Sequence, residues 1–145
     1  HRERKSVISI FLIDLDVAGC PHAVKRYGRV LYDESGRLLG AYEPRELPED
    51  VAMRATKVNP SAYVFARGWV EKKLPLLIPH DPGDGFPSET WLPDLVHVAA
   101  NEEALVTMCD LTDPREALGV NTPQELQEVR RHFADMCGAL SRNVS

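Results

Sequence analysis

The sequence has 145 residues, of which 43% are hydrophobic and 27% charged, a composition that predicts one globular domain over residues 1–145 with a moderate core. A formal net charge of −5 argues against nucleic acid as a partner, because a phosphate backbone repels an acidic protein. The three cysteines are widely spaced and no stretch approaches the roughly 20 apolar residues of a membrane span, so we expect a cytoplasmic protein without membrane contact.

The chain opens with the apolar run Val7–Ile13, which is typical of an interior strand covered on both faces. Asp14 and Asp16 follow at its carboxyl end. Two carboxylates at this spacing can hold a divalent cation, or they can form the nucleophile pair of a phosphatase, the weakest of the functional hypotheses. The ordinary alternative is a pair of solvated loop carboxylates.

The next stretch predicts a β-hairpin, because the β-rich runs Tyr27–Tyr32 and Arg37–Glu43 flank the turn-forming residues Asp33–Gly36. Gly28 opens the first strand, and its missing side chain lets a ligand ring approach the backbone closely. Glu43 closes the second strand, where its carboxylate can accept hydrogen bonds from a sugar hydroxyl or an amide. The alternative for Glu43 is an exposed glutamate at a strand end.

The middle of the chain predicts alternating strands and short helices. Asn59 stands at the entrance of a strand over Val58–Phe65, and a helix over Trp91–Asn101 is expected to start from Ser88 or Thr90 as N-cap. We expect a loop with one helical turn over Arg45–Lys57 and a short helix over Arg67–Leu76. A long loop of a type that often forms a lid is expected over Pro79–Pro87, and a strand over Ala104–Cys109.

The stretch Glu116–Arg131 predicts a short apolar strand, a polar corner and a long amphipathic helix. Thr122 as N-cap and Glu125 three residues later predict a capping box at the start of that helix. Asn121 is exposed at the corner, where its amide can coordinate a hard cation or bind a sugar or phosphate, or simply form a local Asx turn. The helix is expected to lay one apolar stripe across a sheet, formed by Leu126, Val129, Phe133, Met136 or Cys137, and Leu140.

The order of these elements predicts an α/β protein with a mixed sheet. The usual opening unit of a nucleotide-binding domain is a strand that leads through a glycine-rich phosphate loop into a helix. That unit has no counterpart in this sequence. We therefore expect part of a mixed sheet rather than a complete doubly wound domain.

Several segments occur together in one order, namely Tyr27–Val30, Glu43, Val58–Phe65, Glu89–Val96 and Leu118–Pro123. In this order they resemble the carboxyl-terminal half of the catalytic domain of sugar-1-phosphate nucleotidyltransferases, most closely the N-acetylglucosamine-1-phosphate uridylyltransferases. The resemblance implies a partial Rossmann-like, GT-A-like nucleotidyltransferase fold that lacks the amino-terminal nucleotide-binding half.

The site residues are assigned by this resemblance. It implies that Gly28, Glu43 and Asn59 bind the sugar of a sugar 1-phosphate. It also implies that Asn121 is one ligand of a Mg²⁺ ion held against the phosphates of a nucleoside triphosphate. An amide oxygen adds no charge, so one carboxylate, one amide and phosphate oxygens can complete an octahedral Mg²⁺ shell. No catalytic side chain is assigned within this chain.

The sequence also departs from the family. The family's glycine-rich phosphate loop, basic phosphate contacts and metal-binding aspartate have no counterpart here, and Trp91 and Pro93 replace a tyrosine and a threonine of the family's helix motif.

Two hypotheses follow. The chain is a fragment of a nucleotidyltransferase (pyrophosphorylase) that forms a nucleoside-diphosphate sugar, or it is a non-catalytic sugar-binding or regulatory and assembly module. In either case it is expected to associate with the missing half or as a homo-oligomer. Neither the nucleotide nor the sugar follows from the sequence.

Overall fold

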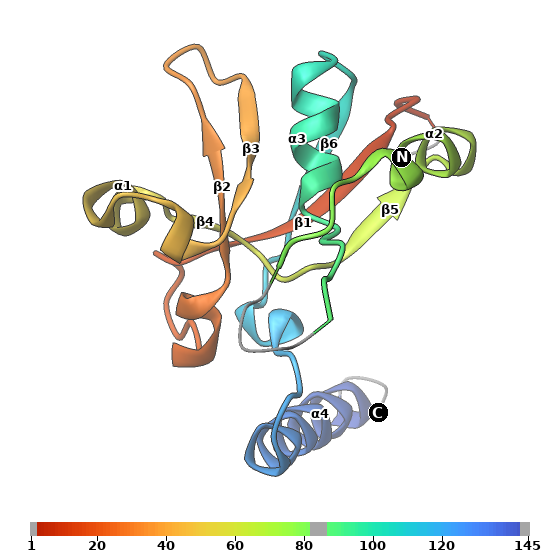
Figure 1. Ribbon diagram of the computed structural model, residues 1–145. Helices are drawn as coiled ribbons and strands as arrows, with labels where there is room; N and C mark the ends of the chain where they lie inside the picture. Colours follow the sequence, from red (N-terminus) through yellow and green to blue (C-terminus); the bar gives the residue numbers. More distant parts are fainter. Residues whose placement is uncertain (1–2, 82–86, 143–145) are drawn as a thin grey trace.

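The computed structural model describes residues 3–81 and 87–142. Its centre is a sheet of six strands in the order β3-β2-β4-β1-β5, with β6 paired to β1 (Figure 1). β1 and β6 run parallel, whereas the pairs β1–β4, β1–β5, β2–β3 and β2–β4 are antiparallel. The predicted mixed sheet of an α/β protein is therefore confirmed. The strands are β1 Ile8–Asp14, β2 Gly28–Tyr32, β3 Leu38–Tyr42, β4 Lys57–Asn59, β5 Tyr63–Phe65 and β6 Val106–Asp110.

Short helices connect these strands and one long helix follows them. The α-helices are α1 Glu49–Arg54, α2 Arg67–Lys73, α3 Asp94–Asn101 and α4 Pro123–Arg142. Single 3₁₀ turns lie at His22–Arg26, Pro44–Glu46, Leu74–Leu76 and Pro114–Ala117. Within the described residues, none of these helices has the combination of length and apolar character that a membrane crossing needs.

Strand β1 is the centre of the core, as its apolar sequence predicts. It pairs with β6 on one side and with β4 and β5 on the other. Alternate side chains of β1 point toward α3, because side chains alternate between the two faces of a strand. The most deeply buried members of the main core cluster, each at most 1% exposed, are Ile8, Ile10 and Leu12 from β1 and Leu95, Val96 and Ala99 from α3.

A salt-bridge network fastens the carboxyl ends of the two parallel strands. Asp14 ends β1 and Asp110 ends β6, and the Lys57 ammonium at the start of β4 lies 3.4 Å and 2.8 Å from their carboxylates. The backbone N–H of Asp16 donates to the Asp14 carboxylate at 3.1 Å. That hydrogen bond, followed by the contact with Lys57, lowers the pKa of Asp14. The carboxylate considered as a cation ligand or nucleophile is thus engaged by protein groups.

The predicted strand over Val58–Phe65 is divided into β4 and β5. The Asn59 side-chain oxygen accepts a hydrogen bond of 2.9 Å from the Ser61 backbone N–H, which closes a tight turn. Ser61 has a φ of +59°, a left-handed conformation that no strand can contain. The two short strands therefore pair with different parts of β1.

The helix over Trp91–Asn101 begins later than predicted. It starts at Asp94 with Pro93 as N-cap, so neither Ser88 nor Thr90 caps it. The predicted long loop at Pro79–Pro87 falls largely on residues 82–86, which lie outside the described residues. Its described ends are joined by an antiparallel bridge between His80 and Glu89, with N–H···O distances of 2.7 Å and 2.9 Å.

The short apolar strand predicted within Glu116–Arg131 is wrong. The chain instead forms a 3₁₀ turn over Pro114–Ala117 before the corner. Asp113 caps this turn, because its carboxylate accepts a 2.9 Å hydrogen bond from the Arg115 backbone N–H and Pro114 suits the first helical position. Local capping therefore prevails over the apolar pattern.

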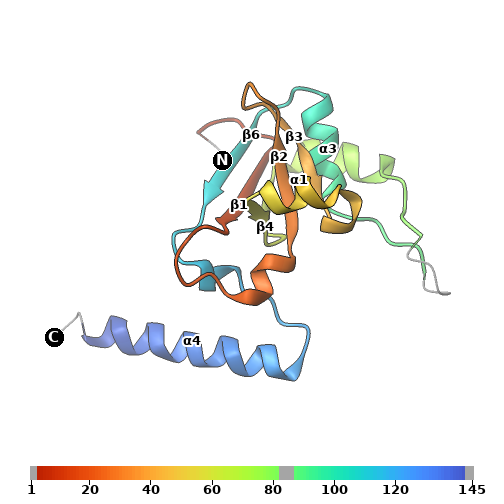
Figure 2. The same cartoon turned by 90° about the vertical axis from the view of Figure 1, so that its left-hand side faces the viewer.

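The start of α4 agrees with the predicted capping box. The Thr122 hydroxyl accepts a hydrogen bond from the Glu125 N–H at 3.2 Å, and the Glu125 carboxylate accepts one from the Thr122 N–H at 2.9 Å. The rest of the expectation is wrong, because α4 extends away from the sheet rather than across it (Figures 1 and 2). Phe133 and Leu126 on its apolar stripe are 66% and 38% exposed. At the start of the helix, the Arg26 guanidinium lies 3.6 Å from the Glu125 carboxylate.

The edge strand β3 is packed against α3 through a glycine–histidine contact. The His97 ring lies over Gly40, where a Cβ atom would be only 2.3 Å from His97 Nδ1. His97 Nε2 lies 2.7 Å from the Ala41 carbonyl oxygen, and the ring meets Tyr42 edge-on at 4.5 Å. This geometry requires a residue without a side chain at position 40.

We expect Gly40→Ala to lower the free energy of unfolding by about 1–3 kcal/mol, because the new methyl group displaces His97 from its contact with β3. Urea denaturation measures this change. Gly68→Ala in α2 is the matched control, since a Cβ atom added there would have no other atom within 4 Å, and it should leave stability unchanged or slightly higher. Equal losses in both variants would contradict the packing argument.

Candidate functional site

Three of the four predicted site residues meet at one corner of the sheet. Gly28 at the start of β2 is the direct partner of Asn59 at the end of β4. Glu43 immediately follows β3, and a Cβ atom on Gly28 would lie 3.7 Å from the Glu43 carboxylate oxygen Oε1 and 3.2 Å from the Tyr42 carbonyl oxygen. The hairpin and the β4–β5 turn therefore bring together residues that are far apart in the sequence.

The Asn59 side chain is buried and shapes this corner from within. It is 4% exposed. Its amide nitrogen donates to the Tyr63 hydroxyl, and its oxygen accepts the Ser61 backbone N–H. Burial raises the pKa of Tyr63, and the negative charge of Glu43 acts in the same direction. The second N–H of the Asn59 amide makes no hydrogen bond among the described residues.

The corner also contains an aromatic stack that the sequence did not reveal. The Trp91 ring stacks on His80, with centroids 3.9 Å apart and an angle of 8° between the planes, and the Arg45 guanidinium lies 5.2 Å from the Trp91 centroid. His80 Nε2 lies 2.7 Å from an Asp94 carboxylate oxygen. Arg45 follows Glu43 by two residues, and Asp94 is the first residue of α3. The contacts of Arg45 with Trp91 and of His80 with Asp94 therefore join the segment after Glu43 to the start of α3.

No local signal predicts the contact between Arg45 and Trp91, since the two residues belong to segments far apart in the chain. In the sequence, Trp91 stands out only as a replacement for a tyrosine of the family motif. The structure shows that it contacts the segment after Glu43 rather than standing alone on the approach to α3.

Asn121 lies at the corner before α4, apart from the other three residues. Its backbone N–H donates to Glu125 at 2.8 Å, while its exposed side chain makes no hydrogen bond among the described residues. The nearby Gly119 N–H donates to the Tyr27 hydroxyl at 2.8 Å, which ties this segment to the residue preceding Gly28. No described contact joins Asn121 directly to Glu43 or Asn59, and the Asx turn considered for it does not form.

The donor atoms at Asn121 fit one position of a Mg²⁺ shell but do not complete one. Its amide oxygen is a hard, neutral ligand of the kind that Mg²⁺ accepts. Within residues 3–81 and 87–142, no group of three or more His, Cys, Asp or Glu side chains is arranged to hold a metal ion. Any Mg²⁺ held here would need further oxygen ligands from substrate or from other polypeptide.

The structure is an α/β protein in which three of the predicted site residues meet at one end of a mixed sheet. Comparison with known proteins gives this class a family context. The chain is 28% identical over 132 residues to the bifunctional protein GlmU of Pelobacter propionicus, covering 90% of this chain and 26% of that protein. It is 31% identical over 110 residues to GlmU of Solibacter usitatus, covering 75% and 22%, and 29% identical over 134 residues to GlmU of Methylococcus capsulatus, covering 92% and 26%.

These matches confirm the resemblance to the sugar-1-phosphate nucleotidyltransferases on which the site assignment depends. The chain spans about a quarter of the length of the curated relatives it matches. No family model matches the sequence.

The Asn59–Tyr63 hydrogen bond provides a test of the corner's architecture. We expect Tyr63→Phe to lower the free energy of unfolding by about 1–3 kcal/mol, because the buried Asn59 amide loses its acceptor. Urea denaturation measures the loss. Tyr42→Phe is the matched control, since the Tyr42 hydroxyl makes no hydrogen bond among the described residues, and its stability should change little. A Tyr63→Phe protein as stable as the control would contradict this role for Asn59.

The segment before Asn121 should carry a pH-dependent part of stability. Hydrogen bonds from Arg115 hold the pKa of Asp113 at about 2, below its ordinary value of 3.8. Because the folded-state pKa is the lower one, this contribution is present above about pH 4 and is lost as the pH falls toward 2. We expect Asp113→Asn to be less stable than the wild type at pH 7 and to lose less stability between pH 7 and 3, measured by urea denaturation.

Asp50→Asn in α1 is a matched control, because its carboxylate is exposed on the helix surface. It should keep the wild-type loss of stability between the two pH values. If Asp113→Asn shows that same loss, the capping interaction does not supply the pH dependence.

Proposed function

We propose that this chain supplies the sugar side and one Mg²⁺ ligand of a nucleotidyltransferase that forms a nucleoside-diphosphate sugar and pyrophosphate from a nucleoside triphosphate and a sugar 1-phosphate. In this proposal the mixed sheet is part of a GT-A-like catalytic fold whose nucleotide-binding half lies outside residues 1–145. The observation that carries it is the convergence of Gly28, Glu43 and Asn59 on one corner, in a chain similar to GlmU proteins.

Each corner residue has a definite task in this proposal. The absent side chain of Gly28 leaves room for the sugar ring beside the β2 backbone. The Glu43 carboxylate accepts hydrogen bonds from sugar hydroxyl or amide groups, and the remaining N–H of Asn59 donates to a sugar oxygen. Because Asn59 is fixed by Tyr63 and Ser61, this donor is oriented before the sugar binds.

Asn121 is the proposed metal ligand. Its amide oxygen would hold Mg²⁺ together with phosphate oxygens of the substrates and a carboxylate outside the described residues. When bound, the ion offsets negative charge on the reacting phosphates. The Gly119–Tyr27 hydrogen bond positions the Asn121 segment relative to the hairpin that carries Gly28.

A second candidate is a non-catalytic sugar-binding or assembly module. It is favoured by the separation within the site, since Gly28, Glu43 and Asn59 adjoin one another while Asn121 makes no described contact with Glu43 or Asn59. A sugar phosphate could then bind the corner without any transfer of a nucleotide. In both candidates the chain associates with the missing half or with another copy of itself.

Pyrophosphate release separates the two candidates. The longest natural form that contains this chain is incubated with Mg²⁺, UTP and N-acetylglucosamine 1-phosphate, and then with other nucleotide and sugar 1-phosphate pairs. We expect release with one pair, and we expect Asn121→Ala to reduce it by about 10–100-fold because a metal ligand is lost. Asn101→Ala, at the exposed end of α3, is the matched control and should keep full activity.

Binding of the sugar 1-phosphate is measured on the same proteins by calorimetry. Binding weakened by Glu43→Gln without pyrophosphate release from any pair would support the non-catalytic module. Neither binding nor release in any form would contradict both candidates.

A further inference from the structure

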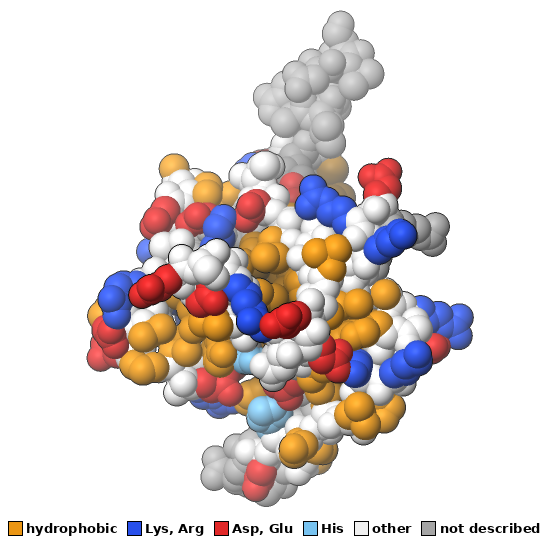
Figure 3. Space-filling view, turned by 90° about the horizontal axis from the view of Figure 1, so that it is seen from above, with side chains coloured by type: hydrophobic (Ala, Val, Ile, Leu, Met, Phe, Trp, Pro, Cys, Tyr) orange, Lys and Arg blue, Asp and Glu red, His pale blue; other side chains and the backbone are white. Residues whose placement is uncertain are grey.

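A cavity lies at the end of the hairpin opposite to Glu43, and nothing in the proposed function uses it. It opens between the start of β3, the end of α3 and the β6 strand, and its volume is about 440 Å³. Figure 3 views this end of the molecule and shows hydrophobic side chains around a hollow in the surface. The volume lies within the range of roughly 300–1,000 Å³ that is typical of small-molecule pockets.

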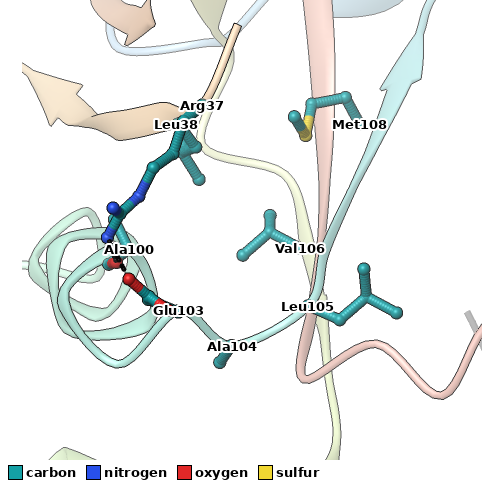
Figure 4. A pocket seen from close by; sticks show the side chains of 8 residues that line it. All are labelled: Arg37, Leu38, Ala100, Glu103, Ala104, Leu105, Val106 and Met108. Carbon is teal, nitrogen blue, oxygen red and sulfur yellow. Dashed lines mark hydrogen bonds and ion pairs between the residues drawn. The ribbon is translucent and has the colours of Figure 1, made fainter. Parts of the chain in front are cut away.

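Six of the eight residues that line the cavity are apolar. Leu38 and Ala100 form part of the main core and are 9% and 8% exposed, so the cavity reaches the top of that core. Val106 and Met108 are half-buried on β6 and line the facing wall, as Figure 4 shows. Leu105 is 55% exposed at this wall. The apolar surface therefore continues from the core to the opening.

One ion pair supplies the charged groups of the cavity. The Arg37 guanidinium lies 3.1 Å from the Glu103 carboxylate and 3.4 Å from the Ala100 carbonyl oxygen (Figure 4). The Arg37 and Glu103 side chains are 54% and 73% exposed, and a pair this exposed contributes little to stability. Glu103 also sits at a φ of +53°, which is unfavourable for a residue with a side chain. The exposure of the ion pair, rather than this backbone conformation, makes Glu103 a weakly held partner of Arg37.

We propose that this cavity binds a small amphipathic carboxylate, with its apolar chain along Leu38, Val106 and Met108 and its carboxylate on Arg37 in place of Glu103. Arginine is suited to this exchange because its planar guanidinium binds carboxylates through two parallel hydrogen bonds. The apolar chain adds the burial of hydrocarbon against side chains that are now open to water. The site is independent of the Gly28–Glu43–Asn59 corner.

The proposal makes two substitutions act in opposite directions. Octanoate is titrated into the isotope-labelled protein, and binding is followed by the backbone amide signals of residues 104–108 in two-dimensional NMR. Arg37→Gln should weaken octanoate binding by about ten-fold, because the charged donor is lost. Glu103→Gln should strengthen it several-fold, because the competing carboxylate is removed while the Arg37 charge stays.

Matched probes and variants test the charge and the cavity separately. Octan-1-ol should bind more weakly than octanoate and be insensitive to Arg37→Gln, and octylammonium should bind least. Arg67→Gln removes the charge of another exposed salt bridge, in α2, and should leave octanoate binding unchanged. Ala100→Leu should fill the cavity and reduce the binding of both octanoate and octan-1-ol, with NMR dispersion showing that the variant is folded.

Several results would overturn the proposal. One is the absence of octanoate-dependent shifts at residues 104–108 in the wild type. Another is a Glu103→Gln variant that binds octanoate less tightly, as expected if the ion pair only holds the α3 end in place. Equal affinities for octanoate and octylammonium would also exclude a carboxylate site.

Discussion

The pairing of β1 on both of its edges, with α3 over one of its faces, is the constraint on which the rest of the molecule depends. The strand is buried because every second side chain meets α3, and its backbone groups are satisfied by β6 on one side and by β4 and β5 on the other. This fixes the hairpin beside β4 and sets the position of the chain that follows β6. The two ends of the hairpin differ as a result. The corner of Gly28, Glu43 and Asn59 lies at one end, and the cavity beside Leu38 lies at the other.

In the polar corner, a local turn at Asn59 positions residues that are far apart in the sequence. Asn59 closes a turn with Ser61, which interrupts a strand, and the same amide reaches the Tyr63 hydroxyl. The turn holds Asn59 opposite Gly28, and the missing side chain of Gly28 brings the backbone close to Glu43. The corner is therefore pre-formed by backbone pairing and by buried hydrogen bonds, without a contribution from Asn121. The three residues proposed to bind the sugar and the residue proposed to bind Mg²⁺ therefore lie in separate parts of this chain.

Sequence reasoning worked where the physical signal was local. The apolar run after Val7, the turn at Asp33 and the capping box at Thr122 each depend on neighbouring residues, and the structure has all three. It failed where a local signal competed with a stronger one. Asp113 and Pro114 imposed a 3₁₀ turn on a stretch whose apolar pattern favoured a strand, and the stripe on α4 did not predict what the helix packs against. An apolar stripe in the sequence shows that a helix has an apolar face. Which element that face packs against depends on the direction in which the preceding loop leads the helix.

The sequence alone determined the identity of most strands and helices, the hairpin and the start of α4, because each is encoded by residues close together in the chain. It also determined the resemblance to sugar-1-phosphate nucleotidyltransferases, through the order of its motifs along the chain. Only the tertiary structure decided that Gly28, Glu43 and Asn59 share one corner, that Arg45 and Trp91 stack beside it, and that Asn121 stands apart. These relations depend on strand order and register. They arise from the burial of the whole sheet, so no single segment contains them.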